Sequence, residues 1–237
     1  MRQICSRATL DRLSIRKLDE QRTGVLNSNN PQSEADARYK AVRRSTWFRS
    51  VSARLASLSG IGQRCMYCGG SESTQVEHYR PKAIYPKFAF SWENFLWVCG
   101  VCNQFKGDRF EESLLPINPI DDLVWNHFFI DEFGNLCAKW DLTTGDLDQR
   151  AIRTIELLAL DRQPLQESRF ARLIDLRAKI ADTVALLQQG ALTQIDLETR
   201  LLEWFEQPFQ PDVADYFFDG PGRRDDPFNQ FFVLAGL

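Results

Sequence analysis

Two pairs of cysteines carry the clearest chemical signal in the sequence. Cys65 and Cys68 form one pair, and Cys99 and Cys102 form the other, each with two residues between them. This spacing lets two thiolates from one tight turn occupy two corners of a zinc tetrahedron. A redox dithiol needs only one such motif and a thioredoxin-like context, which is missing here. The pattern therefore predicts a structural zinc held by four cysteines, with no open coordination position for catalysis.

The segment between the cysteine pairs contains Glu77, followed immediately by His78, one of the 2 histidines in the chain. If this segment is a strand, the two side chains start on opposite faces. Hydrolysis of a phosphodiester needs a base to activate water and a cation to neutralise charge on the phosphoryl oxygens. An imidazole beside hard oxygen ligands supplies both, and such ligands suit Mg²⁺ or Mn²⁺ rather than a second zinc. The alternative is that His78 is a structural histidine, the commoner role of a lone histidine.

The order of these residues resembles the HNH nuclease superfamily, whose members carry an acidic residue plus His, then an Asn, then a Cys-Asn followed by Lys-Gly. The matching positions here are Glu77, His78, Asn94, Cys102, Asn103, Lys106 and Gly107. The resemblance implies that His78 is the general base and that Glu77 and Asn103 are ligands of the catalytic cation. It also implies that Asn94 holds the His78 loop and imidazole in orientation. Many members have Asp in place of Glu77, so the longer side chain must reach the metal from a different backbone position.

Four basic residues lie close to these positions in the sequence. Arg80 and Lys82 follow the expected base, and Lys106 and Arg109 follow the expected ligand Asn103. Their positions predict contacts with phosphate oxygens. The alternative is that they are solvated surface residues, and Asn94 in the same way could cap a turn.

The remaining histidine and cysteines are expected to be structural. His127 is interpreted as a residue at a strand edge, and Cys5 and Cys137 lack a partner at metal-binding spacing. A small apolar side chain is the ordinary role for such cysteines.

Three further segments, residues 78–82, 92–97 and 154–162, resemble one subgroup of the superfamily. It consists of the HNH nucleases of bacterial anti-phage systems, namely the Septu-type nuclease and its retron-associated relatives. The subgroup implies a nuclease that works with an ATPase partner on nucleic acid. The sequence leaves DNA and RNA open as substrates, because an HNH core contacts one phosphate and reads little of the bases.

The rest of the sequence predicts the elements that position this site. Residues 1–32 predict a polar arm, and helical spacing of apolar residues predicts one helix over 33–60. A hairpin is expected with strands over 128–130 and 136–140, followed by helices from 147 to 190 and over 193–206. The last thirty or so residues are rich in aromatic side chains, which predicts a tail that packs by burying rings.

These elements predict an α+β fold that is mostly helical. A small ββα-metal zinc core of the HNH, treble-clef-like type is expected over residues 61–115. Residues 1–60 would form an N-terminal arm and helix, and residues 116–237 a connector hairpin, a helical region and the aromatic tail.

Composition limits the possible functions. The chain has 237 residues, 43% of them hydrophobic, and a net charge of −3, which predicts a globular protein without overall basic character. No apolar stretch approaches the roughly 18 residues of a membrane span, so a cytoplasmic protein is expected. Two alternatives to an active nuclease stay open: a non-catalytic zinc-stabilised module that binds nucleic acid or protein, and a nuclease that is silent without its partner.

Overall fold

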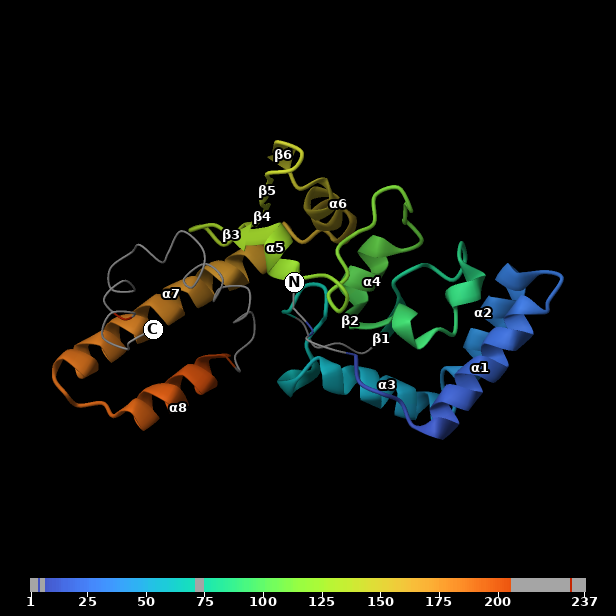
Figure 1. Ribbon diagram of the computed structural model, residues 1–237, viewed down its shortest axis with the longest axis horizontal. Helices are drawn as coiled ribbons and strands as arrows, with labels where there is room; N and C mark the ends of the chain where they lie inside the picture. Colours follow the sequence, from blue (N-terminus) through green and yellow to red (C-terminus); the bar gives the residue numbers. More distant parts are fainter. Residues whose placement is uncertain (1–3, 5–6, 71–74, 206–230, 232–237) are drawn as a thin grey trace. The chain divides into compact units, whose positions relative to one another are not determined.

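The computed structural model describes residues 4, 7–70, 75–205 and 231, which belong to two compact units (Figure 1). The N-terminal unit is Gln3–Leu123, and the C-terminal unit is Val124–Leu237 together with Met1–Arg2. The segments expected as N-terminal arm and zinc core therefore both lie in the N-terminal unit, apart from the first two residues.

Three helices open the N-terminal unit: α1 (Arg12–Leu26), α2 (Pro31–Val42) and α3 (Thr46–Leu58). Each begins after a side chain that accepts a hydrogen bond from the backbone three residues later, namely Asp11, Asn30 and Ser45. Capping of this kind stabilises a helix start by about 1 kcal/mol.

Two expectations for this region were wrong. Residues 12–26 form α1 rather than part of a polar arm, because a good N-cap and a narrow buried stripe of Ser14, Leu18 and Val25 are enough to hold the helix. The single helix expected over 33–60 is two helices, since the side chain of Ser45 accepts from the backbone of Phe48 and starts a new one.

A β-hairpin follows, formed by β1 (Gln75–His78) and β2 (Phe95–Val98), with α4 (Gly100–Lys106) directly after it. The strands are antiparallel, with Glu77 opposite Leu96 and His78 opposite Phe95. Neighbouring residues of a strand point to opposite faces, so His78 faces α2 and Glu77 faces α4. The ring contact between His78 and Tyr39 and the ion pair between Glu77 and Lys106 agree with this assignment. Short 3-10 helices fill the connections: Ile61–Gln63, Pro86–Phe88 and Trp92–Asn94.

The C-terminal unit contains the second expected hairpin. Its strands are β3 (Phe128–Ile130) and β4 (Leu136–Ala138), which pair as predicted, although the second strand ends at Ala138 rather than at residue 140. The remaining elements are α5 (Val124–His127), β5 (Trp140–Asp141), β6 (Asp146–Leu147), α6 (Gln149–Leu158), α7 (Gln163–Gln188) and α8 (Gln194–Phe205). The helices expected after residue 147 are therefore confirmed. Most of the expected aromatic tail lies outside the described residues, but Phe231 is buried with its ring centroid 6.4 Å from that of Trp204.

The described part of the chain is thus a mixed α and β structure, mostly helical, with small two-stranded sheets. This confirms the expected fold class at that level. Among the described helices, none combines the length and the apolar character needed to cross a bilayer.

Candidate metal centre and active site

Four cysteines from two turns meet at one end of the β1–β2 hairpin. The Sγ atoms of Cys65, Cys68, Cys99 and Cys102 all lie within 4.8 Å of one another, and all four residues are buried. The first turn is joined to β2 by a hydrogen bond from the Met66 backbone to the Trp97 carbonyl (2.9 Å). The second turn is the start of α4, where Cys99 is the N-cap. The two knuckles predicted from the sequence are therefore brought together by strand pairing.

The cluster fits a zinc ion. Zinc–sulfur bonds of about 2.3 Å in a tetrahedron place the sulfurs a little under 4 Å apart, and Cys68 and Cys99 Sγ are 3.9 Å apart. Burial raises the pKa of the Cys65 thiol, and a cation at the cluster would favour its thiolate form. Cys137 lies elsewhere and contacts the Asn135 carbonyl, and Cys5 lies outside the described residues.

His78 ends β1 and is held on two sides by aromatic rings. Its ring centroid lies 4.8 Å from that of Tyr39 on α2 and 5.2 Å from that of Phe95 on β2. The Nε2 atom is 2.9 Å from the carbonyl oxygen of Ala89. Because a carbonyl only accepts hydrogen bonds, Nε2 carries the proton and Nδ1 keeps a lone pair.

The imidazole of His78 is neutral under physiological conditions. Burial lowers its pKa to about 4, although the bond to the Ala89 carbonyl acts in the opposite direction. A neutral ring with a fixed tautomer is the form that accepts a proton from water.

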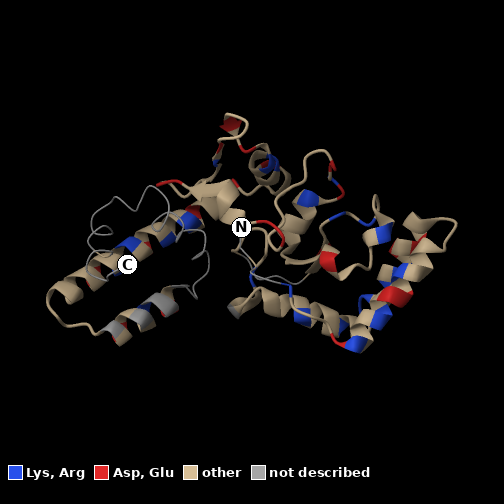
Figure 2. Cartoon of the chain, viewed as in Figure 1, with Lys and Arg blue, Asp and Glu red and all other residues tan. Residues whose placement is uncertain are grey.

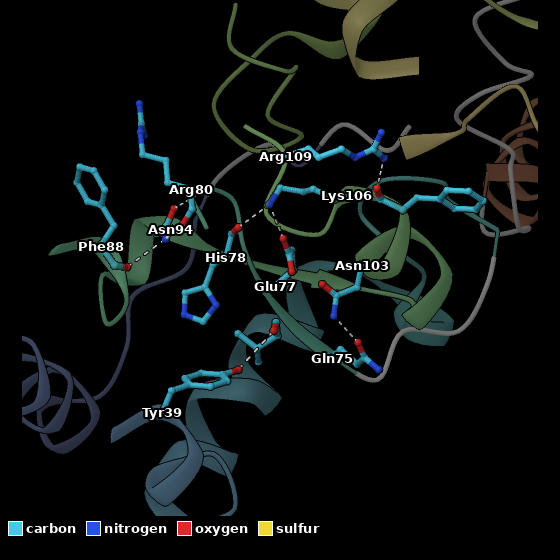
Figure 3. Close-up of polar contacts among 12 residues, drawn as sticks. Tyr39, Gln75, Glu77, His78, Arg80, Phe88, Asn94, Asn103, Lys106 and Arg109 are labelled. Carbon is cyan, nitrogen blue, oxygen red and sulfur yellow. Dashed lines mark hydrogen bonds and ion pairs between the residues drawn. The ribbon is translucent and has the colours of Figure 1, made fainter. Parts of the chain in front are cut away.

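Glu77, on the other face of β1, forms a buried ion pair. Its Oε1 atom is 2.6 Å from Nζ of Lys106, which also donates to the backbone carbonyl of His78 at 2.9 Å (Figure 3). Burial raises the pKa of Glu77, and the positive charge of Lys106 opposes that rise. Lys106 is 0% exposed, so this arrangement gives no support to the phosphate contact expected for it.

A small cavity of about 190 Å³ brings several expected site residues together. Glu77, His78, Lys82 and Asn103 line it, together with two residues that the sequence did not single out, Tyr39 and Asp108. Gly107 ends α4 with φ 50°, a conformation that suits glycine, and the turn there brings Asp108 to the cavity.

Oxygen atoms around this cavity suit a hard divalent cation. The Asn103 amide nitrogen donates to Gln75 Oε1 at 2.6 Å, which leaves the amide oxygen on the side of the Glu77 carboxylate (Figure 3). Asp108 adds a second carboxylate, whose charge also raises the pKa of Glu77. Carboxylate and amide oxygens are ligands that Mg²⁺ and Mn²⁺ accept. These residue types suit such an ion, and the ammonium of Lys106 competes for one oxygen of Glu77.

Asn94 joins the two ends of the loop between β1 and β2. Its Oδ1 atom accepts from the Arg80 backbone (2.7 Å), and its Nδ2 atom donates to the carbonyls of Arg80 (2.9 Å) and Phe88 (3.1 Å). The Tyr79 backbone donates in turn to the Asn94 carbonyl (2.8 Å). These bonds fix the backbone immediately after His78.

Arg7 supports the same turn from the N-terminal segment. Its guanidinium donates to the carbonyls of Trp92 (2.7 Å), Glu93 (2.8 Å) and Phe95 (2.9 Å), on both sides of Asn94. No sequence pattern pointed to Arg7, because its partners are backbone atoms more than eighty residues away.

The other basic residues near the site have different surroundings. Lys82 pairs with Asp36 on α2 while still lining the cavity. Arg80 pairs with Glu112 (3.2 Å), and its guanidinium lies 5.2 Å from the ring centroid of Phe88. Arg109 is exposed and donates to the carbonyl of Phe105.

Comparison with known proteins gives one partial relationship. A scan against models of known protein families gives no match. Over 114 residues, or 46% of the chain, the sequence is 31% identical to the Septu protein PtuB of Bacillus thuringiensis. The aligned segment spans 41% of that protein's length, less than half of it. This weak homology agrees in part with the resemblance to the Septu-type subgroup.

Proposed function

We propose that this chain is a metal-dependent endonuclease of the HNH type that hydrolyses phosphodiester bonds in nucleic acid. One observation carries the proposal: His78 is a neutral imidazole with a free lone pair, in a cavity that it shares with the oxygen ligands Glu77 and Asn103. The order of strand, strand and helix around the four cysteines supports an HNH ββα-metal core.

In this proposal His78 is the general base. Its Nδ1 accepts a proton from the attacking water, while the bond from Nε2 to the Ala89 carbonyl keeps the ring in the required tautomer. Asn94 positions the imidazole by fixing the backbone of Tyr79 and Arg80. The ring of Tyr39 packs against the imidazole and limits its rotation.

Glu77 and Asn103 would hold the catalytic Mg²⁺ or Mn²⁺, with Asp108 as a further oxygen ligand at the same cavity. When bound, the cation supplies positive charge to the phosphoryl oxygens and the leaving group. Lys106 orients Glu77 and balances its charge. The zinc at the four cysteines holds the hairpin and α4 together and takes no part in the reaction.

Arg80, Lys82 and Arg109 are the proposed contacts for phosphate groups of the substrate. Lys82 borders the cavity and would have to share its charge with Asp36. Further Lys and Arg residues recur along the N-terminal helices (Figure 2), namely Arg38, Lys40, Arg43, Arg44, Arg49 and Arg54. Local basic charge of this kind attracts a polyanion even though the chain as a whole is slightly acidic.

We further infer that the protein is the nuclease subunit of a bacterial anti-phage system with an ATPase partner, acting in the cytoplasm. The similarity to a Septu protein supports this role. Because basic residues barely outnumber acidic ones between Arg64 and Arg109, affinity of the isolated chain for nucleic acid should be modest and sensitive to salt. This near balance of basic and acidic residues is consistent with a nuclease that cleaves only in the presence of its partner.

The test is cleavage of supercoiled plasmid and of total tRNA by the purified chain with Mg²⁺ or Mn²⁺. The expected result is metal-dependent cleavage that His78→Ala lowers by a factor of about 10² or more, the usual contribution of a general base. The matched control is His127→Ala, which removes the other histidine and should leave cleavage unchanged. Metal-dependent cleavage that proceeds at the same rate in the His78→Ala protein and the parent would refute the proposal.

A second function, a zinc-stabilised binding module without catalysis, is favoured by one observation. The Glu77 carboxylate is already bound to Lys106, which occupies an oxygen that a catalytic cation needs. EDTA separates the two functions, because a nuclease loses activity at chelator levels that leave the cysteine-bound zinc in place. A binding module would keep its nucleic-acid affinity under the same treatment.

A further inference from the structure

A second and larger cavity lies beside the proposed catalytic cavity. Its volume is about 350 Å³, and residues from α2, α3, both strands of the first hairpin and α4 line it. This volume is within the range of about 300–1,000 Å³ that is usual for sites binding small organic groups. Nothing in the proposed hydrolysis uses this space.

The two cavities share part of their walls. Tyr39, Val76 and Asn103 line both of them, and Figure 3 draws Tyr39 on α2 and Asn103 on α4. The Tyr39 hydroxyl donates to the Val76 carbonyl at 3.4 Å, which holds the tyrosine between the two spaces. Burial raises the pKa of Tyr39 to about 12, so this wall stays an uncharged phenol. A group in the larger cavity is therefore an immediate neighbour of any phosphate at His78.

The larger cavity offers aromatic surface. Trp97 lines it and is 9% exposed. The aromatic rings of Tyr39 and Phe48 add apolar surface next to it.

Positive charge lies at the cavity as well. Arg43, one turn after Tyr39 on α2, lines the cavity, is exposed and forms no salt bridge with any described carboxylate. Flat apolar surface and a cation together match a nucleotide: a flat base attached to a phosphate.

We propose that this cavity binds the base of a nucleotide next to the scissile phosphate, and that the substrate is therefore nucleic acid with unpaired bases. A base that is paired and stacked in a duplex cannot enter a cavity in the protein without being extruded. The proposal rests on the proposed nuclease function, since it assigns the neighbouring cavity to the scissile phosphate. It applies to single-stranded DNA and RNA alike, because both present the same flat bases.

The cavity can be filled without altering the catalytic residues. Ser52 on α3 lines it, and its hydroxyl donates to the Phe48 carbonyl of the same helix (3.0 Å). Ser52→Leu places apolar volume in the cavity. Arg43→Gln removes the positive charge, and Arg44→Gln is its matched control, because Arg44 is an exposed neighbour that lines neither cavity.

Binding is measured by fluorescence anisotropy in the full chain carrying His78→Ala, so that the substrate stays intact with Mg²⁺ present. The probes are a labelled single strand of DNA, the same sequence as RNA, the corresponding duplex, and a single strand with abasic sugars in its centre. The His78→Ala protein should bind the intact strands about tenfold more tightly than the abasic strand. Ser52→Leu should remove that difference and leave duplex binding unchanged, and Arg43→Gln should weaken binding more than Arg44→Gln.

The outcomes of this experiment separate failure of the cavity proposal from failure of the nuclease function. Equal affinity for the intact and abasic strands, or a base preference that survives Ser52→Leu in a chain with unchanged zinc content and melting temperature, overturns the cavity proposal. Cleavage by the chain with native His78 can still succeed in that case, so the nuclease function stands independently. Conversely, a base preference lost in Ser52→Leu, together with no cleavage under any condition, supports the cavity and contradicts the nuclease.

Discussion

Each compact unit contains an antiparallel hairpin with a histidine at its edge, and the two histidines differ in almost every physical respect. His78 is buried beside aromatic rings, and its Nε2 bonds to a backbone carbonyl. His127 is partly exposed, and its Nδ1 lies 2.6 Å from the carboxylate of Asp148. His78 lies at a cavity with other candidate functional groups.

The comparison shows that local sequence does not decide the role of a histidine. Asp148 is the N-cap of α6, so the bond to His127 ties the β3–β4 hairpin to the start of that helix. This is a structural role. His78 instead has a ring whose tautomer is fixed by a neutral carbonyl, which leaves a nitrogen available for chemistry.

The two hairpins also differ in the groups that join their strands. The turn of the second is local: the Asp131 carboxylate accepts from the backbones of Phe133 and Asn135, and Gly134 adopts φ 81°. The first hairpin has a long connection between its strands and is joined by Asn94 and by the four cysteines. A hairpin held by distant groups should depend on them far more strongly.

Loss of the proposed zinc at the four cysteines should have the largest effect. Cys68→Ser, or a chelator strong enough to extract zinc, is expected to unfold the N-terminal unit, because structural zinc contributes about 10–16 kcal/mol in small zinc domains. The C-terminal unit should stay folded. Zinc content and limited proteolysis of the two units provide the measurement, and simultaneous loss of both units would contradict this expectation.

Lys106→Met should cause the second-largest loss of stability. It leaves the buried Glu77 carboxylate without its partner, which costs about 3–5 kcal/mol for a buried ion pair. The control is the double variant Lys106→Met with Glu77→Gln, which removes both charges and should recover much of the stability. Urea unfolding of the N-terminal unit measures both, and an equal loss in the single and double variants would argue against a charge effect.

Asn94→Ala should have a smaller effect on stability and a clear one on activity. It removes the three hydrogen bonds to Arg80 and Phe88, and the groups left unpaired cost about 1–3 kcal/mol. Cleavage should fall because the His78 loop is no longer fixed. Asn94→Asp keeps the acceptor but loses both donated bonds, so it should fall between Ala and the parent in stability.

Asp148→Ala should have the smallest effect, limited to the C-terminal unit. It removes the N-cap of α6 and the partner of His127, which is worth about 1 kcal/mol. Asp148→Asn retains a capping oxygen and should lose less. Nuclease activity is expected to be unchanged in both variants, and a large loss of cleavage would reveal a functional role for the second hairpin.

The elements predicted best are those whose signal is local. Cys-x-x-Cys spacing encodes the shape of a single turn, and the turn residues at 131–135 encode the second hairpin. Helix α1 was not predicted, because only three of its residues are buried. The break between α2 and α3 was also not predicted, since apolar spacing continues through it and a single cap at Ser45 decides it.

The candidate site residues divide in the same way, into those with a local sequence signal and those without one. His78, Glu77, Asn94 and Asn103 could be named from their order in the sequence. Tyr39, Asp108 and Arg7 could not, because they reach the site through packing of α2, the turn after α4 and bonds to distant carbonyls. Their roles depend on neighbours far away in the sequence.

The sequence by itself determined the two cysteine knuckles, the chemical type of the candidate site and most of the helices, because spacing and residue type are properties of short segments. Only the tertiary structure decided that Lys106 is buried against Glu77, which tautomer His78 adopts, and that a second cavity lies beside it. The reason is physical: burial, hydrogen-bond partners and charge balance are set by residues that the fold brings together from different segments.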